Sequence, residues 1–125
     1  MATRLLLLMI AGSAGTLCRY GLAGLVQNGL GARFPWGTLA VNLTGCLVAG
    51  LVFGLFESRW GLSGEARTIV LIGFLGAFTT FSGFMLETTE LARDAQWLAA
   101  AANLVLQNGL GAAALYGGLV ASRLV

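Results

Sequence analysis

The sequence has no histidine and no lysine, only one proline and two cysteines, and few charged residues of either sign. Without histidine it lacks the commonest metal ligand and proton shuttle, which argues against a redox metal centre and histidine-based catalysis. No set of nucleophile, base and orienting group is apparent either. The arginines are scattered, with no basic run that could follow a phosphate backbone. We therefore expect neither an enzyme nor a protein that binds nucleic acid.

The two cysteines, Cys18 and Cys46, both fall inside apolar stretches. A structural disulfide is more typical of the exposed loops of a small secreted domain. The sequence therefore predicts two small, buried thiols and no disulfide.

What the sequence does contain is apolar residues: 58% of the 125 positions are hydrophobic, 10% are charged, and the mean hydropathy is +0.87. These values are typical of integral membrane proteins. A helix needs roughly 20 residues to cross about 30 Å of hydrocarbon. Four such segments occupy nearly the whole chain, so we expect an all-α, multi-pass membrane protein with a single transmembrane domain. The predicted spans are residues 5–27, 37–56, 68–91 and 97–120.

The start of the chain has two interpretations. An arginine, an apolar run and a group of small residues imitate a signal peptide with its cleavage site. However, the apolar character resumes at Leu22–Val26, so one long helix over residues 5–27 is the simpler account.

On this first helix, Gly12, Gly15 and Arg19 share a face. The glycines would let another helix approach closely. Arg19 would then either face a polar vestibule or a carboxylate, or extend its guanidinium to the membrane interface.

The stretch Gly73–Phe84, GFLGAFTTFSGF, lies near the middle of the third apolar segment. It is too apolar for a surface loop and too rich in Gly, Thr and Ser for a regular helix, so we predict a broken helix. In hydrocarbon an unpaired carbonyl costs several kcal/mol, so such a break survives only where it is buried in protein, lines a wet cavity or binds an ion. Phe81 and Phe84 would share a face beside Ser82, either as pore residues or as ordinary packing residues.

Polar side chains also occur inside the second and fourth segments. Asn42 and Gly45 share a face with Ala49, and Asn103, Gln107 and Gly111 recur at four-residue intervals. Such amides can simply tie helices together by hydrogen bonds. They are equally consistent with the wall of a narrow polar path.

If the four spans alternate, the arginines are almost evenly divided between the two sides of the membrane. One side holds Arg4, Arg59, Arg67 and Arg123, and the other holds Arg33, Arg93 and, depending on its depth, Arg19. Because arginine bias in short loops sets orientation, this near balance permits insertion both ways round. A protein inserted both ways can pair with its own inverted copy, so we expect an antiparallel, dual-topology homodimer.

Three motifs taken together resemble the Fluc (CrcB) family of fluoride channels: Gly15–Tyr20 (GTLCRY), Pro35–Gly45 (PWGTLAVNLTG) and Gly73–Phe84. The likeness extends over all four spans in order. It implies a fluoride-selective channel in the bacterial inner membrane that lets cytoplasmic fluoride leave passively. It also implies an antiparallel dimer with two pores, whose broken third helices cross around a structural sodium ion.

The resemblance implies a role for individual residues. The sodium ligands would be the main-chain carbonyls of Gly76 and Thr79. The fluoride path would be formed by Phe81, Phe84, Asn42, Ser82, Glu87 and, at a vestibule, Arg19. The sequence departs from the family pattern at Ala77 and Gly83, and in the fourth span, where the resemblance assigns no role to Asn103 or Gln107.

The chemistry of these residues agrees with that expectation. A path for fluoride must replace its tightly held water with hydrogen-bond donors without binding the ion too strongly for exit. Asn42 and Ser82 supply donors, and the positive edges of phenylalanine rings attract anions. Free carbonyls at the break would suit a hard cation such as sodium.

Two other functions agree with part of the sequence. A small dual-topology multidrug exporter has a similar size, but such exporters carry a membrane-buried glutamate in their first helix, where this chain has Arg19 and no carboxylate. A non-transporting assembly subunit would leave the broken third helix unexplained.

Overall fold

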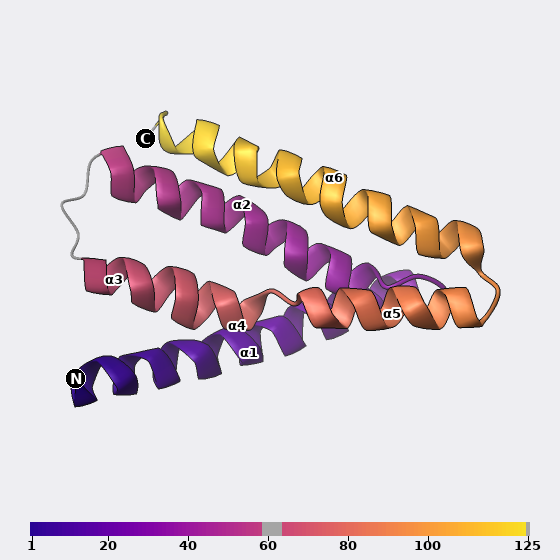
Figure 1. Ribbon diagram of the computed structural model, residues 1–125, viewed down its shortest axis with the longest axis horizontal. Coiled ribbons are helices and arrows are strands. Elements are labelled where there is room, and N and C mark those ends of the chain that lie inside the picture. The colour runs from indigo at the N-terminus through magenta and orange to yellow at the C-terminus, as the bar shows by residue number, and fades with distance from the viewer. Residues whose placement is uncertain (59–63, 125) are drawn as a thin grey trace.

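The computed structural model describes residues 1–58 and 64–124, and all regular secondary structure in this part of the chain is helical (Figure 1). The elements in order are α1 (Ala2–Leu30), α2 (Trp36–Ser58), α3 (Gly64–Thr68), the π-helix η1 (Ile69–Leu75), α4 (Gly76–Phe78), α5 (Phe81–Arg93) and α6 (Trp97–Ser122).

Four segments are long and apolar enough to cross a membrane: Ala2–Leu30, Trp36–Glu57, Gly64–Arg93 and Trp97–Ser122. They match the four predicted spans in number and order. The first three begin before and end after the predicted bounds, and the fourth begins at residue 97 and ends two residues later than predicted. The chain is therefore a multi-pass, all-α membrane protein. Part of the predicted connection between the second and third spans, residues 59–63, lies outside the described residues.

The connection between α1 and α2 is shorter than the nine residues at 28–36 that the sequence indicated, because α1 continues to Leu30. It ends at Gly31, whose φ of 88° is readily adopted only by glycine. The amide of Gln27 closes the turn: Nε2 donates to Gly31 O at 2.7 Å and to Phe34 O at 2.9 Å, and Oε1 accepts from Gly37 N at 2.9 Å. The side chain of Gln27 thus fixes the conformation of the turn that connects α1 to α2.

Helices α2 and α6 have the most extensive contact of any two helices described, and Figure 1 shows them running side by side. A Cβ on Gly50 would collide with Leu115 O, and one on Gly118 with Leu47 O. The two backbones therefore touch, which is the use of glycine that membrane helices favour.

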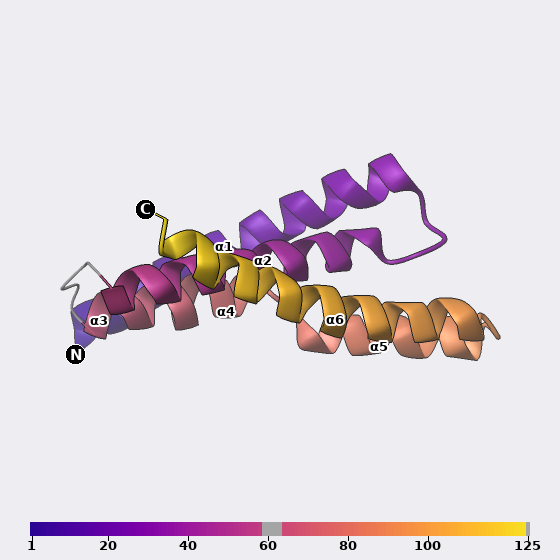
Figure 2. The ribbon, with the colours of Figure 1, turned by 90° about the horizontal axis from the view of Figure 1, so that it is seen from above.

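Helix α1 packs on the first half of the third span through its predicted glycine face. A Cβ on Gly15 would collide with Phe74 O, and one on Gly12 would lie 3.8 Å from Gly73 O. Figure 2 shows that the C-terminal half of α1 then leans away from α5 and α6.

The uncovered side of α1 overturns one expectation about the cysteines. Both are free thiols, but Cys18 is exposed and Cys46 is half-buried. The preceding residue on the helix, Leu17, is 71% exposed. The prediction of burial was wrong for Cys18, because none of the described residues covers this face of the helix.

The third span is broken inside the predicted stretch. Helix α4 ends at Phe78 and α5 begins at Phe81. Between them, Thr79 (φ −80°, ψ 159°) and Thr80 (φ −147°, ψ 109°) are extended. Figure 1 shows this link as a short thread between two nearly collinear helices. The break divides the apolar segment near its middle, as the sequence predicted.

Candidate functional site

The break is held by Asn42, which reaches it from α2. Its Oδ1 accepts from Thr80 N at 2.9 Å, and its Nδ2 donates to Thr80 O at 3.1 Å. The same Nδ2 also donates to Gln107 Oε1 on α6 at 3.0 Å. Both hydrogens of the Asn42 amide are therefore engaged, and three helices meet at this one side chain.

Gly45 lies one turn after Asn42 and lets α2 approach the break. A Cβ at this position would collide with Thr79 Cγ2 and would lie 3.3 Å from the ring of Phe78. The shared face of Asn42 and Gly45, predicted from their spacing, thus points at the interruption of the third span.

The break releases main-chain oxygens. Thr79 N donates to Leu75 O at 3.0 Å. This is the last regular hydrogen bond of the first half-helix, the part of the third span before the break (residues 64–78). The next bond would join Thr80 N to Gly76 O, but Thr80 N donates to Asn42 instead. Gly76 O thus loses its helical donor. These oxygens lie at the negative end of a helix, and oxygen ligands of this kind suit a hard monovalent cation, so Gly76 and Thr79 fit the sodium site that the resemblance implied.

Arg19 contacts the second of these candidate ligands. Its Nη1 donates to Thr79 O at 3.5 Å, a long hydrogen bond. Arg19 shares the face of α1 that carries Gly12 and Gly15, as predicted, but its guanidinium lies at the break. It therefore places a positive charge where the first half-helix ends.

The second half-helix begins at the same point with the opposite polarity. Thr80 caps α5, since its Oγ1 accepts from Gly83 N at 3.0 Å. The positive end of α5 therefore faces the break from the other side. A broken helix of this type offers a negative pole to a cation and a positive pole to an anion within a few residues.

The two phenylalanines of the predicted pore contact each other edge to face, with ring centroids 5.6 Å apart and planes at 71°. Their surroundings differ: Phe84 is only 3% exposed, whereas Phe81 is 72% exposed. Ser82 is also exposed. The protomer thus encloses Phe84 but leaves Phe81 and Ser82 on its open surface.

A set of polar side chains, which we call the polar ladder, joins α2 and α6 to the part of α5 that follows the break. Thr38 Oγ1 donates to Glu87 Oε1 at 2.6 Å, and Asn103 Nδ2 donates to Thr88 Oγ1 at 2.9 Å. In the described part of the chain, three buried polar atoms have no partner: Glu87 Oε2, Asn103 Oδ1 and Gln107 Nε2. Asn103 is fully buried and Gln107 is 8% exposed, so the polar stripe predicted on the fourth span faces the protein interior.

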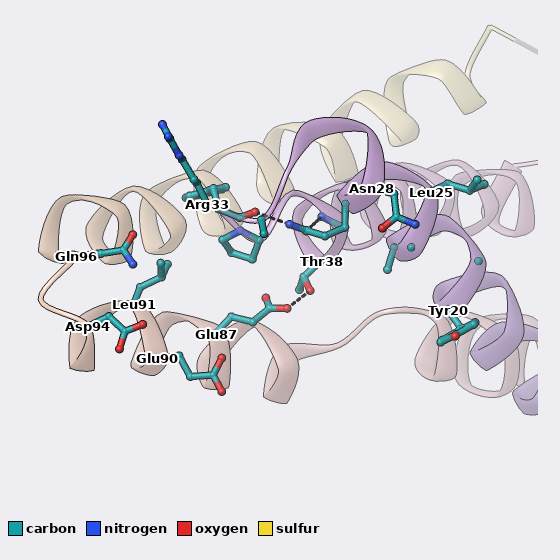
Figure 3. Close-up of a pocket in the computed structure, with 18 residues that line it drawn as sticks. Tyr20, Leu25, Asn28, Arg33, Thr38, Glu87, Glu90, Leu91, Asp94 and Gln96 are labelled. Carbon is teal, nitrogen blue, oxygen red and sulfur yellow. Dashed lines mark hydrogen bonds between the residues drawn. The ribbon is translucent and has the colours of Figure 1, made fainter.

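An open groove of about 1160 Å³ leads toward the polar ladder between the C-terminal half of α1 and α5. Figure 3 shows Thr38 and Glu87 joined by their hydrogen bond, with Glu90 and Asp94 further along α5 and Arg33 on the opposite side. The groove is polar along α5 and acidic, so it can hold water. Arg19 is not among the residues that line the groove, because its guanidinium contacts Thr79 O at the break.

Several of these residues were missed or left without a role by the sequence reasoning. Thr38 was not singled out, although it lies four residues before Asn42 and so on the same helical face. Gln107 was noted only as part of a stripe. Its hydrogen bond with Asn42 joins residues 65 positions apart, and no local spacing reveals such a pair.

Comparison with known proteins places these features in a family. Residues 6–119 match the family described as "CrcB-like protein, Camphor Resistance (CrcB)". The chain is 54% identical over 125 residues to a protein of Desulforapulum autotrophicum named "Fluoride-specific ion channel FluC", with the whole of both chains covered. A protein of the same name from Nitrosococcus oceani is 48% identical, again over the full length of both chains.

The match extends over more than half of the chain, and the relatives align from end to end. Their names describe ion channels, in agreement with the absence of a catalytic constellation from the sequence. The broken third span, with Asn42, Thr79 and Thr80 at its centre, lies within the matched region. The chain therefore belongs to the CrcB-like (Fluc) family and is not an enzyme.

Proposed function

We propose that this protein is a fluoride-selective channel through which cytoplasmic fluoride leaves the cell passively. The names of its relatives support fluoride as the transported ion. The observation that carries the proposal is the broken third span, where a half-helix ends at Phe78 and another begins at Phe81. A positive helix end beside aromatic ring edges suits a small anion.

The proposed path begins in the groove beside Glu87. Carboxylates line this groove, so it would admit water but would not itself select anions. We assign selectivity to the buried region beyond it. There, Gln107 Nε2 is an unengaged donor, and the edge of a phenylalanine ring at position 84 can replace part of the ion's hydration. Asn42 is already engaged with three partners, so it would hold the path in shape and orient Gln107.

The proposed unit is an antiparallel, dual-topology homodimer with two pores. A single protomer leaves Phe81 72% exposed, together with Ser82 and much of α1. It also offers only two of the oxygens that we assign to sodium, at Gly76 and Thr79. An inverted second copy would cover the exposed residues and double the number of oxygens, and the balanced arginines permit this inversion. In a two-fold symmetric dimer each path would occur twice, whereas a sodium ion on the symmetry axis would occur once. The dimer would therefore have two paths and one central sodium ion.

The bacterial inner membrane is the proposed location. Four apolar spans require a lipid bilayer, and the relatives are proteins of bacteria such as Nitrosococcus oceani. A multidrug exporter is not proposed in its place, because the first helix carries Arg19 and no carboxylate that could exchange protons for a substrate.

Halide selectivity in liposomes tests this function. Purified protein would be reconstituted into vesicles loaded with potassium fluoride or potassium chloride. Valinomycin would be added so that potassium can leave with the anion, and efflux would be followed with ion-selective electrodes. We expect fluoride to leave far faster than chloride. Loaded vesicles without protein give the baseline rate of leakage. Equal rates for the two ions would contradict fluoride selectivity.

A further inference from the structure

The hydrogen bonds of Asn42 affect both main-chain oxygens that the proposed sodium site uses, although Asn42 donates a hydrogen bond to neither of them. From these bonds we infer that Asn42 is the positioning residue that creates the cation site. This inference rests on the proposed function, because it concerns the sodium ion of that proposal. It assigns to Asn42 a task other than lining the fluoride path.

The first step concerns Gly76. In an uninterrupted α-helix, Gly76 O would accept from the amide four residues later, at Thr80. That amide donates to Asn42 Oδ1 at 2.9 Å. Asn42 therefore takes the donor that would have closed the turn, and the Gly76 carbonyl is left available as a ligand.

The second step concerns Thr79. Its carbonyl belongs to the same planar, trans peptide unit as the Thr80 amide, so the two groups point in opposite directions. By holding Thr80 N on the α2 side, Asn42 turns Thr79 O away from α2 and toward α1. The contact of that oxygen with Arg19 Nη1, at 3.5 Å, is on the side that this geometry requires.

Asn42 also keeps Thr80 O on the α2 side, away from the side that Thr79 O faces. Asn42 Nδ2 donates to Thr80 O at 3.1 Å. One carboxamide thus frees Gly76 O, turns Thr79 O toward α1 and keeps Thr80 O on the α2 side. Its remaining hydrogen goes to Gln107 Oε1, which links the cation site to the donor that we place on the fluoride path.

The consequence is that sodium binding depends on the acceptor of Asn42, not on its donor to Gln107. Sodium that binds only the folded protein raises its unfolding temperature. Purified protein in detergent would therefore be unfolded by heat across a series of sodium chloride concentrations, with N-methylglucamine chloride keeping the ionic strength constant. For the wild-type protein we expect the unfolding temperature to rise with sodium.

Three variants locate the effect. Asn42→Leu removes the acceptor at similar volume. We expect the half-saturating sodium concentration to rise by about tenfold or more, because the site loses the hydrogen bond that holds its ligands in place. Asn42→Asp keeps an acceptor for Thr80 N, so its sodium response should be retained. Gln107→Leu leaves both bonds to Thr80 in place, so its half-saturating sodium concentration should equal that of the wild type even where its fluoride flux falls.

Each outcome bears on the inference. An unchanged sodium response in Asn42→Leu would overturn it, and so would loss of the response in Asn42→Asp. If Asn42→Leu gives no folded protein, the contrast rests on Asn42→Asp and Gln107→Leu, both of which must respond to sodium. A wild-type protein that conducts fluoride in liposomes but shows no sodium response would overturn this inference while leaving fluoride conduction intact.

Discussion

Asn42 Nδ2 lies 3.0 Å from Gln107 Oε1, and this bond fixes the direction of the Gln107 amide. With its oxygen bound to α2, the amide presents Nε2 as a buried donor that has no partner in the described structure. Leaving a buried donor unpaired costs about 1–3 kcal/mol, so such a group is expected to have a partner in the working protein. We propose that the transported anion or its water is that partner.

Gln107→Leu is the first prediction. The substitution replaces the donor with an apolar side chain of similar size, so an ion passing this point would lose one hydrogen bond. We expect fluoride efflux to fall roughly ten- to a hundredfold, the equivalent of about 1–3 kcal/mol in the barrier.

The matched control is Asn108→Leu, the next residue on α6. Asn108 is exposed and donates to Leu104 O of its own helix at 2.7 Å. Its replacement should leave efflux near the wild-type rate. Equal losses in the two variants would show that amides on α6 matter only for the helix as a whole, against a specific role for Gln107.

Thr38→Val is the second prediction. Thr38 donates to Glu87 Oε1, and the other carboxylate oxygen is already without a partner. We expect the variant to lose about 1–3 kcal/mol of folding stability, because a half-buried carboxylate loses a donor. Thermal unfolding in detergent measures this, with Thr89→Val as control, since exposed Thr89 donates only to Met85 O of its own helix. A Thr38→Val protein as stable as the control would contradict the argument.

Gly45→Ala is the third prediction. A Cβ here would collide with Thr79 and press on the Phe78 ring, so α2 must move away from the break. We expect a loss of about 1–3 kcal/mol in stability together with reduced fluoride efflux. Gly109→Ala is the control, because among the described residues no atom outside its own stretch of helix lies within 4 Å of a Cβ at that position. If both variants behave alike, close approach at Gly45 is unimportant.

The fourth prediction concerns Phe81 and Phe84, each replaced by isoleucine. Both variants should lose most of their fluoride efflux, because the positive ring edge is removed. Only Phe84→Ile should destabilise the isolated protomer, since Phe84 is 3% exposed and Phe81 is 72% exposed. Size-exclusion chromatography would verify that the oligomer survives. Normal efflux in both variants would remove these rings from the path.

The sequence predicted those features that depend on spacing within one helix. The shared face of Gly12, Gly15 and Arg19 packs on the third span, and Asn42 and Gly45 both face the break. Thr79 and Thr80 interrupt the third span inside the predicted stretch, because a run of Gly, Thr and Ser within apolar sequence disfavours a regular helix. These conclusions followed from helical periodicity and propensity alone.

The parts that were missed depend on contacts between distant segments. That Asn42 uses both ends of its amide on Thr80 and Gln107 follows from where α2, α5 and α6 meet, 38 and 65 residues apart in sequence. The π-helix η1 was also unforeseen. Gly73 packs there against α1, where an added Cβ would lie 3.1 Å from Ala11 Cβ, and such packing cannot be read from the residues of the third span.

The most direct test of the account is fluoride release from potassium fluoride-loaded liposomes containing the wild-type protein, before and after the potassium carrier valinomycin is added. A passive channel moves charge, so we predict little release before valinomycin and rapid release after it. Rapid release without valinomycin would indicate electroneutral exchange, and no release even after its addition would mean that fluoride does not pass. Either result would contradict a passive fluoride channel.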